Sequence, residues 1–216
     1  MFTGIIEEIG RVSDISQKAE AFVLTIEAHN MLEDIKRGES IAVNGVCLTV
    51  TSFSTYTFTA DVMHETLRAT SLQSLQRGSR VNLEKAMGAK GRFGGHFVTG
   101  HVDGIGKIKS KKQRGNACDY KIQTNPELLK TMIVKGSVAV DGTSLTLFDI
   151  DEETFTLSLI PHTMAMSVLG EKGVNDVVNI ESDMMGKYIY HFLVDQESSK
   201  KSSQMTKSFL KQNGFA

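Results

Sequence analysis

The feature that most constrains this chain is a duplication within its own sequence. Residues 40–50 are Ser-Ile-Ala-Val-Asn-Gly-Val-Cys-Leu-Thr-Val, and residues 137–147 are Ser-Val-Ala-Val-Asp-Gly-Thr-Ser-Leu-Thr-Leu. Six of these eleven positions are identical at an offset of 97 residues, whereas ordinary residue frequencies give roughly one identity by chance. A repeat of this kind indicates that one structural unit is built twice, which limits the folds open to the chain.

Further blocks repeat in the same order. The matching pairs are Tyr56-Thr-Phe-Thr59 with Glu153-Thr-Phe-Thr156, Val81-Asn-Leu-Glu84 with Val178-Asn-Ile-Glu181, and, at an offset of 96, Thr3-Gly4 with Thr99-Gly100 and Ile9-Gly10 with Ile105-Gly106. Because all of these blocks keep nearly one offset, we interpret the chain as two tandem copies of a single module.

Each copy has the pattern of a β-structure. Short apolar runs rich in β-branched residues, at 22–26, 40–50 and 57–62 in the first copy, end at Gly, Asn, Asp or Ser. Asn44-Gly45 and Asp141-Gly142 each lie between two such runs, which is the strongest short-range signal of a hairpin. About five or six short strands in a module of this length predict a small barrel or sandwich.

Two segments between the strands have a different character. Residues 125–133 begin with Asn-Pro, a capping residue and a favourable first helical residue, and predict a short helix whose counterpart in copy one is residues 29–35. Residues 87–95 contain four glycines and predict a linker between the copies.

After the second copy the chain becomes helical in pattern. Met185, Tyr188, Ile189, Phe192 and Leu193 recur at helical spacing and predict a helix over residues 184–195, before a polar stretch and a short amphipathic segment at 206–213. Copy one has no such helix, so this tail either caps the second module or packs against another subunit.

The composition argues against several functional classes. The 24 Lys+Arg and 25 Asp+Glu nearly cancel, so the chain lacks the positive field that nucleic-acid binders use. No run of about 18 apolar residues is present to span a membrane, and acids at positions 7 and 8 stand where a signal peptide would be basic. Cys47 and Cys118 have no metal-binding spacing, and together these features favour a cytoplasmic protein with reduced thiols.

Cys47 is the first candidate for reactive chemistry. It follows the first hairpin turn, and its equivalent in copy two is Ser144. Both side chains can make a polar contact, but only cysteine is a strong nucleophile near neutral pH. The alternative is a buried structural cysteine. Cys118 lies in a polar sequence, and we interpret it as an incidental loop residue.

Two histidines lie in the sequence Gly94-Gly-His-Phe-Val-Thr-Gly-His101. On a strand, this spacing puts the side chains of His96 and His101 on opposite faces, which makes them a poor zinc pair. His101 aligns with Ile5 of copy one, so its imidazole is expected in one pocket only. The competing interpretation of each is a structural histidine.

Polar pairs also occur after a strand of each copy, as Glu65-Thr66 and His162-Thr163. Such pairs suit a polyhydroxyl chain or the edge of a heterocycle, since each ligand hydroxyl needs a partner. The alternative is that the threonines cap helices. The glycine-containing segments 88–94 and 104–106 lack the complete patterns of phosphate-binding loops, so no phosphate site is expected.

Taken together, these residues resemble those of the riboflavin synthase family. The similar motifs are Met1-Phe-Thr-Gly-Ile-Ile6, Asn44-Gly-Val-Cys-Leu-Thr-Val50, Glu65-Thr-Leu67, Gly94-Gly-His-Phe-Val-Thr-Gly-His-Val-Asp103, Asp141-Gly-Thr-Ser-Leu-Thr146, Ile160-Pro-His-Thr163 and Asn179-Ile-Glu-Ser-Asp183. They follow one another from the first residue to about residue 195, and the combination of the first and fourth motifs is highly specific.

The resemblance implies a mainly β fold of two tandem, homologous six-stranded antiparallel β-barrels with short helices. The barrels would span residues 1–96 and 97–183, and a C-terminal helical tail at 184–216 would hold a homotrimer. Each barrel is expected to bind one 6,7-dimethyl-8-ribityllumazine, in an active site that joins the N-terminal barrel of one subunit to the C-terminal barrel of its neighbour. The implied reaction is a dismutation that yields riboflavin and 5-amino-6-ribitylaminouracil without a metal or redox cofactor. Lumazine synthase is a further candidate partner.

The resemblance also implies site residues. Ser40, Cys47, His96 and His101 resemble the catalytic cluster of the N-terminal pocket, where we expect His101 to move protons while Ser40 and Cys47 assist addition to the lumazine. The expected substrate contacts of both pockets are Gly4, Ile5, Ile6, Cys47, Leu48, Thr49, Asp61, Val62, Met63, His64, Glu65, Thr66, Gly100, His101, Val102, Lys135, Ser144, Leu145, Thr146, Ser158, Leu159, Ile160, Pro161, His162, Thr163 and Asp183.

A competing class is a non-catalytic protein of the same fold that carries a lumazine or a flavin, such as the fluorescent antenna proteins. Those relatives tend to lose parts of the histidine-containing motif or the C-terminal tail, and this chain has both. The unequal pairs Cys47/Ser144 and Ile5/His101 also favour an enzyme, because they allow one pocket to hold a donor and the other an acceptor.

Overall fold

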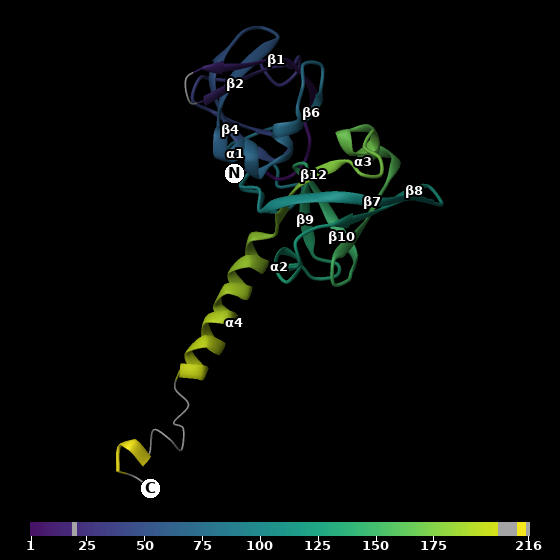
Figure 1. Cartoon of the computed structure of the whole chain (residues 1–216). Helices are drawn as coiled ribbons and strands as arrows, with labels where there is room; N and C mark the ends of the chain where they lie inside the picture. Colours follow the sequence, from purple (N-terminus) through teal and green to yellow (C-terminus); the bar gives the residue numbers. More distant parts are fainter. Residues whose placement is uncertain (19–20, 203–210, 215–216) are drawn as a thin grey trace. The chain divides into compact units, whose positions relative to one another are not determined.

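The computed structural model describes residues 1–18, 21–202 and 211–214. It divides the chain into two compact units, Met1–Asp183 and Met184–Ala216. The first unit contains two β-barrels, coloured purple to blue and teal to green in Figure 1, and the second contains helix α4 (Met184–Ser202). The two sequence copies correspond to the two barrels.

The first barrel is closed by antiparallel strands. They are β1 (Glu8–Lys18), β2 (Ala21–Glu27), β3 (Ser40–Val43), β4 (Val46–Phe53), β5 (Thr57–Met63) and β6 (Arg80–Lys85). Neighbouring strands follow the order β1-β2-β5-β4-β3-β6, and β6 pairs with β1 to close the ring. Helix α1 (His64–Ala69) and the short 3-10 helix η1 (Ser71–Ser74) lie between β5 and β6.

The second barrel repeats this topology. Its strands are β7 (Gly104–Arg114), β8 (Ala117–Gln123), β9 (Ser137–Val140), β10 (Thr143–Ile150), β11 (Thr154–Leu159) and β12 (Val177–Ser182), joined in the order β7-β8-β11-β10-β9-β12. The short helices are α2 (Pro126–Leu129), α3 (Pro161–Ala165) and η2 (Val168–Gly170). Even the register shift between Val12 and Asp14 recurs, between Ile108 and Ser110. The expected pair of six-stranded barrels is confirmed.

Both predicted hairpin turns are present. Asn44 and Gly45 join β3 to β4 with φ of 45° and 79°, and Asp141 and Gly142 join β9 to β10 with φ of 44° and 77°. Two successive residues with positive φ are required by the tight turn whose twist matches that of the flanking strands, and Asn-Gly and Asp-Gly tolerate it best.

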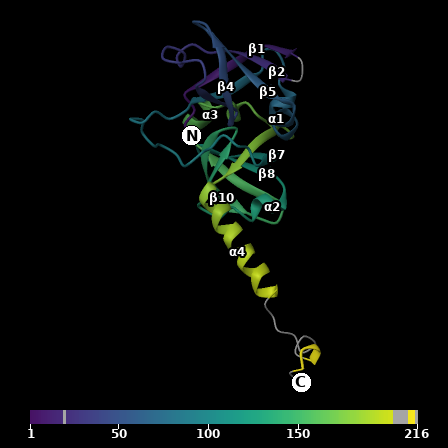
Figure 2. The ribbon, with the colours of Figure 1, turned by 90° about the vertical axis from the view of Figure 1, so that its left-hand side faces the viewer.

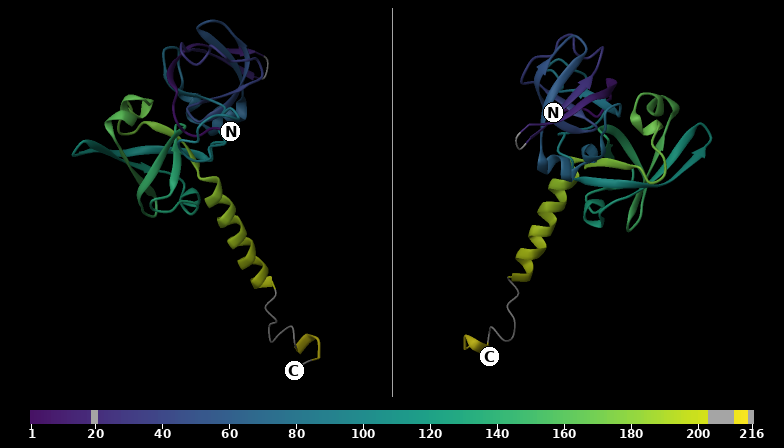
Figure 3. Two further views of the ribbon diagram at one scale, coloured as in Figure 1. Left: turned by 180° about the vertical axis from the view of Figure 1, so that it is seen from behind. Right: turned by 45° about the horizontal axis from the view of Figure 1, so that its top comes forward.

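Each barrel is filled by its own apolar side chains. The largest fully buried ones are Leu24, Ile26, Ile41, Phe58 and Leu83 in the first barrel and Ile108, Tyr120, Ile122, Leu147 and Phe155 in the second. Figures 2 and 3 show the two barrels from further sides. Because side chains fill the interiors, a heterocyclic ligand has to bind on an outer face of a barrel.

A pair of equivalent asparagines joins the barrels. Asn82 in β6 donates from Nδ2 to the carbonyl of Asp141 (2.9 Å) and accepts at Oδ1 from the amide of Val168 (2.8 Å). Asn179 in β12 makes the equivalent bonds, at 2.8 and 2.7 Å, with the first hairpin turn and the first residue of η1. Both asparagines are buried, and their matched contacts relate the barrels by an approximate two-fold axis.

The predicted helix of copy two is shorter than expected, and its predicted counterpart in copy one, residues 29–35, is not helical. In copy two only Pro126–Leu129 is helical, with the side chain of Asn125 accepting a hydrogen bond from the amide of Glu127 (2.9 Å). In copy one residues 29–35 form turns, and the carboxylate of Glu8 accepts from three successive amides that begin at His29. A helix of one turn has little stability of its own, so such local contacts decide its form.

The interpretation of Cys118 as a loop residue is wrong. The turn between β7 and β8 is complete before Ala117, and Cys118 lies in β8 with its side chain buried in the core. Its polar sequence neighbours point outward because side chains alternate along a strand. The glycine-containing segment 87–95 lies between β6 and β7, where a linker was predicted.

Helix α4 is longer than the predicted helix, which ended near residue 195. The five apolar residues that predicted it, from Met185 to Leu193, are each more than half exposed. No helix in the described part of the chain has the length and apolar character needed to cross a membrane. The predicted segment at 206–213 lies mostly outside the described residues.

Candidate functional site

A short arm precedes the first strand of each barrel. The first arm is residues 1–6 and the second arm is residues 97–102, which are equivalent at the offset of 96. The arms pair with each other at Phe2 and Val98, where the amide of each donates to the carbonyl of the other at 2.7 and 3.2 Å. Both side chains are fully buried in a small cluster with Ala42 and Ala139, so the arms meet at the junction of the barrels.

Beyond this bridge each arm crosses to the other barrel. The carbonyl of Gly4 accepts from the amide of Ser144 in β10 (2.7 Å), and the carbonyl of Gly100 accepts from the amide of Cys47 in β4 (2.9 Å). Both glycines have positive φ, 77° and 81°, and a Cβ on either would lie 2.6 or 2.5 Å from the Cβ of its partner. Close approach and backbone conformation therefore both require glycine. Each surface predicted to bind substrate, which we call the first or second pocket after its barrel, combines strands of one barrel with the arm of the other.

One buried glutamate holds each arm in place. Glu84 in β6 accepts from the amide (2.6 Å) and hydroxyl (2.8 Å) of Thr3 and from the amide of Gly4 (3.0 Å). Glu181 in β12 accepts from the equivalent three donors of the second arm at 2.7, 2.7 and 3.0 Å. Burial raises the pKa of Glu84, and the hydrogen bonds from Thr3 act in the opposite direction.

The first pocket lies on the outer face of the first barrel. Cys47 and Thr49 of β4 point outward, and Ser40 of β3 is directly opposite Thr49 on the same face. Asp61 and Met63 are exposed on β5, which pairs with β4. The structure therefore brings two of the predicted catalytic residues, Ser40 and Cys47, onto one surface.

The second arm carries a histidine directly after the glycine that contacts Cys47. His101 follows Gly100 directly, its amide donates to the hydroxyl of Thr99 (3.2 Å), and its side chain is exposed. At the equivalent place beside the second barrel, the first arm carries Ile5, which is 49% exposed. The pair Ile5/His101 is therefore a difference between the two arms, whereas the pair Cys47/Ser144 is a difference between β4 and β10.

The second pocket lies on the outer face of the second barrel. Ser144 and Ser158 are partly exposed there and Thr146 is exposed, on the paired strands β10 and β11. Lys135, just before β9, is exposed and has φ of 66°, where copy one has Gly38 with φ of 92°. Because a left-handed backbone costs a residue with a Cβ roughly 1–2 kcal/mol, a lysine at this position indicates a role for its side chain.

His96 was predicted to join the catalytic cluster of the first pocket, but the structure places it beside Ser144 of the second barrel. Its Nδ1 is 2.7 Å from the hydroxyl of Ser144, and its side chain is 7% exposed. Burial lowers the pKa of His96, while the charge of Asp183 acts to raise it. The segment 94–103 forms only an isolated bridge at Val98 and is no regular strand, so the alternation argument that separated the two histidines does not apply.

Several predicted contacts point away from the pocket surfaces. Leu48, Val62 and Leu159 are buried in the barrel cores, and Leu145 packs against the core of the second barrel. Their neighbours along each strand face outward, so alternation turns these side chains inward. The side chains of the three buried residues are therefore closed to a ligand, and that of Leu145 is only partly exposed.

The polar pairs 65–66 and 162–163 lie in the first turns of α1 and α3. The N-cap residues are Met63 and Ile160, and neither helix has a side-chain cap, so the capping interpretation of the threonines is wrong. His64 contacts the ring of Phe22 edge-on, with the ring centroids 4.9 Å apart. Pro161 begins α3. The pairs lie just after the ends of β5 and β11, as the sequence predicted.

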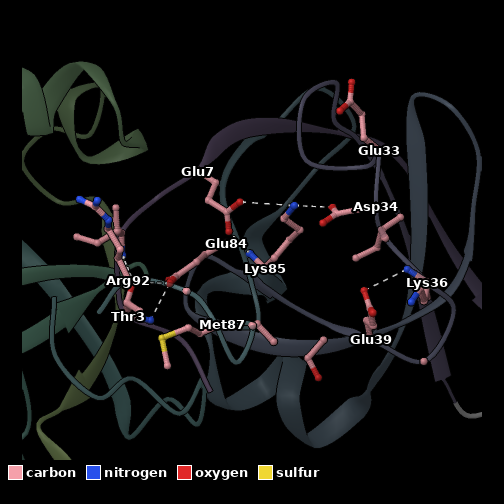
Figure 4. A pocket seen from close by; sticks show the side chains of 17 residues that line it. Thr3, Glu7, Glu33, Asp34, Lys36, Glu39, Glu84, Lys85, Met87 and Arg92 are labelled. Carbon is pink, nitrogen blue, oxygen red and sulfur yellow. Dashed lines mark hydrogen bonds and ion pairs between the residues drawn. The ribbon is translucent and has the colours of Figure 1, made fainter. Parts of the chain in front are cut away.

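A cavity of about 1130 Å³ opens beside the first pocket. Figure 4 shows its charged wall, in which Lys85 lies between Glu7 and Asp34, with Nζ 2.6 Å from the Asp34 Oδ1. The hydrogen bond from Lys85 lowers the pKa of Asp34. Of the residues predicted to be catalytic, only Ser40 lines this cavity, which also reaches Ile5. It therefore adjoins the predicted substrate site and does not coincide with it.

The sequence reasoning missed the residues that hold the arms and barrels together. Asn82, Glu84, Asn179 and Glu181 lie in the repeated blocks 81–84 and 178–181. Two polar residues kept at equivalent positions of otherwise apolar strands were the available signal. Their partners lie up to 135 positions away in the chain, so spacing alone does not reveal them.

Comparisons with known proteins agree with this geometry. The lumazine binding domain family matches the chain twice, over residues 3–86 and 99–183. Riboflavin synthases of Bacillus subtilis (strain 168) and Actinobacillus pleuropneumoniae are 52% and 51% identical over 215 residues, with all of both chains covered. The crystal structure of LumP complexed with 6,7-dimethyl-8-(1'-D-ribityl) lumazine has a TM-score of 0.76 at 22% identity, over 84% of this chain and 99% of LumP.

Two barrels of the same topology, each contacted by the arm of the other, and two matches to one family model define a protein of tandem lumazine binding domains. Identity at about half of all positions, over the full length of both chains, narrows this class to one family. The chain belongs to the riboflavin synthase family of transferases, which confirms the resemblance seen in the sequence motifs.

Proposed function

We propose that this protein converts two molecules of 6,7-dimethyl-8-ribityllumazine into one riboflavin and one 5-amino-6-ribitylaminouracil by transfer of a four-carbon unit. One observation carries the proposal: two pockets of equal framework differ in their reactive residues, Cys47 against Ser144 and His101 against Ile5. A dismutation of two identical molecules requires such a difference, because one molecule has to give carbon atoms and the other has to accept them.

Substrate binding is assigned to the outward-facing side chains of each pocket. The polar ones are Thr49, Asp61 and Thr66 in the first pocket and Thr146, Ser158 and Thr163 in the second. They supply the partners that a ribityl chain and a heterocycle edge need. Met63 and Ile160, which are 71% and 54% exposed at equivalent strand ends, supply apolar surface for the ring.

Catalysis is assigned mainly to the first pocket. Holding two lumazines in reacting geometry supplies up to roughly 7–11 kcal/mol of the acceleration. The C7 methyl group of one lumazine has to lose a proton and an adduct has to break, and His101 transfers these protons. Ser40 and Cys47 assist transient addition at C7. No external oxidant is needed, since one lumazine loses the carbon unit that the other gains.

The second pocket holds the other lumazine. Ser144 supplies a hydroxyl whose orientation is fixed by its 2.7 Å contact with His96. Burial lowers the pKa of His96 and so favours the neutral imidazole, in which one ring nitrogen is a hydrogen-bond acceptor. Lys135 and Asp183 provide charges of opposite sign at this pocket.

The assembly that we propose is a cytoplasmic homotrimer. Residues 1–96 and 97–183 are the two modules, and the tail 184–216 joins subunits through the exposed apolar residues of α4. These residues are Met185, Tyr188, Ile189, Phe192 and Leu193. The complete active site then joins the first pocket of one subunit to the second pocket of its neighbour. Lumazine synthase, which would supply the substrate, is a further partner to test.

A second candidate function is a non-catalytic lumazine or flavin carrier, which the likeness of the fold to LumP favours. Incubation of the purified protein with 6,7-dimethyl-8-ribityllumazine separates the two. Catalytic release of one riboflavin for every two lumazines consumed, followed by absorbance and chromatography, supports the synthase. Tight binding without turnover establishes the carrier and removes the catalytic roles given above.

A further inference from the structure

We infer that Glu84 and Glu181 are positioning residues, each of which aligns the pocket of the opposite barrel through the arm that it holds. This inference rests on the proposed function for its effect on turnover. The claim that the glutamates hold the arms in place depends only on the observed contact of each arm with the opposite barrel.

The two carboxylates are suited to fix an arm. Each lies in the last strand of its barrel, is 4% or 3% exposed, and accepts three hydrogen bonds from two successive arm residues. An ionised carboxylate offers only acceptors, and such charge-assisted bonds are stronger than those between neutral groups. Outside the Phe2–Val98 bridge, only Val102 of the two arms packs against a barrel core, so the glutamates contribute to the anchoring of each arm.

A continuous chain of hydrogen bonds links Glu181 to the proposed proton-transfer residue. Glu181 accepts from the hydroxyl of Thr99 (2.7 Å), and the same hydroxyl oxygen accepts from the amide of His101 (3.2 Å). The adjoining Gly100 is bonded to the amide of Cys47. Glu181 therefore sets the position of His101 and that of Gly100, which packs against Cys47. It contacts neither the proposed substrate nor the side chains of His101 and Cys47.

Glu84 makes the same chain toward the second pocket. Its partner Thr3 accepts from the amide of Ile5 (3.3 Å), and Gly4 is bonded to Ser144. The molecule thus contains two equivalent sets of glutamate–arm hydrogen bonds, each directed at a different pocket. Each one is the matched control for the other.

The test compares Glu181→Gln with Glu84→Gln in the full-length protein, by the rate at which iodoacetamide alkylates Cys47. Glutamine places an N–H group against an arm donor, so the affected arm should loosen. We expect Cys47 to react about tenfold faster in Glu181→Gln and at the original rate in Glu84→Gln, while kcat falls roughly 10- to 100-fold in both. Peptide mass analysis distinguishes Cys47 from the buried Cys118, and Glu127→Gln, on the exposed α2, controls for loss of a surface carboxylate.

Equal alkylation of Cys47 in the wild type and in folded Glu181→Gln would overturn the inference, as would equal acceleration by both substitutions. If either glutamine variant fails to fold, Thr99→Ala and Thr3→Ala remove one donor from each arm and make the same comparison. Absence of turnover in the wild-type protein would remove the proposed function, and the alkylation contrast would still decide whether the glutamates position the arms.

Discussion

In the first barrel the arm-holding glutamate and the interface asparagine are residues 84 and 82, and in the second they are residues 181 and 179. The hydrogen bonds that these pairs make agree to within 0.1 Å from one barrel to the other. The residues that we propose to face the substrate have diverged instead, as Cys47 against Ser144 and Ile5 against His101 show. A buried side chain that holds a distant segment of the chain cannot change without a change in its partner, whereas a side chain that faces solvent can.

One contact beside the first pocket is kept in both barrels, although the residues that form it differ. Lys85 and Asp34 form an ion pair of 2.6 Å on the rim of the first barrel. Their equivalents in the second barrel, Ser182 and Thr131, join through their hydroxyl groups at 2.9 Å. The second barrel keeps a side-chain contact at this place but makes it with uncharged residues. The contact between the two segments is therefore more constrained than the residue types that form it.

The largest expected effect concerns the two arms. His101→Ala should lower kcat about 10²- to 10⁴-fold, because it removes the proposed proton-transfer group, while Ile5→Ala should change it only a few-fold. Steady-state kinetics with 6,7-dimethyl-8-ribityllumazine measures both. Similar losses in the two variants would mean that the pockets are not chemically distinct.

The next effect concerns a charged pair that copy one lacks. Asp141 is fully buried and pairs with Lys172 (2.6 Å), where copy one has Asn44 and Leu75. Lys172→Leu should lower the free energy of unfolding by about 3–5 kcal/mol, since it leaves a buried charge without a partner. The double variant Asp141→Asn/Lys172→Leu, which copies the first barrel, should recover most of this loss in denaturant titrations.

The pH dependence of Lys172→Leu follows from the same contact. Burial raises the pKa of Asp141, and Lys172 opposes the rise. Without Lys172, the folded protein binds a proton at Asp141 more tightly than the unfolded chain does. The free energy of unfolding should therefore increase as the pH falls from neutral toward the raised pKa. A variant whose stability loss is the same at every pH in this range would contradict the assignment.

A smaller effect tests the symmetry of the junction. Asn82→Ala and Asn179→Ala each leave one amide and one carbonyl of the opposite barrel unsatisfied and buried, at a cost of about 2–3 kcal/mol. Thermal and denaturant unfolding should give similar values for the two variants. A large difference would show that one side of the junction carries most of the stability.

The smallest effect concerns the left-handed position before β9 and its equivalent before β3. Lys135→Gly should change stability by less than about 1 kcal/mol, because relief of backbone strain and the greater freedom of unfolded glycine offset each other. The reverse change, Gly38→Lys, should cost about 1 kcal/mol. If Lys135 binds substrate, Lys135→Gly should raise KM while the fold is unchanged.

Much of the fold follows from local pattern. The repeat, the Asn44-Gly45 and Asp141-Gly142 turns and the alternation of β2 and β5 each depend on neighbouring residues, whose conformational limits act before any tertiary contact forms. The same reasoning misplaced Cys118, because a polar surrounding sequence describes the outward face of a strand as well as a loop. It also missed the inward direction of Leu48 and Val62, which alternation in a correctly bounded strand would have given.

By itself, the sequence determined that one β-barrel module occurs twice and that Cys47, His101 and Ser144 break its symmetry. Only the tertiary structure decided which barrel each arm serves, and so placed His96 beside Ser144 and the residue before His101 against Cys47. The physical reason is that the contact of each arm with the opposite barrel depends on hydrogen bonds between groups about 50 to 140 positions apart in the chain. Sequence periodicity reports which face a side chain takes, and it contains no information on which distant backbone group will meet it.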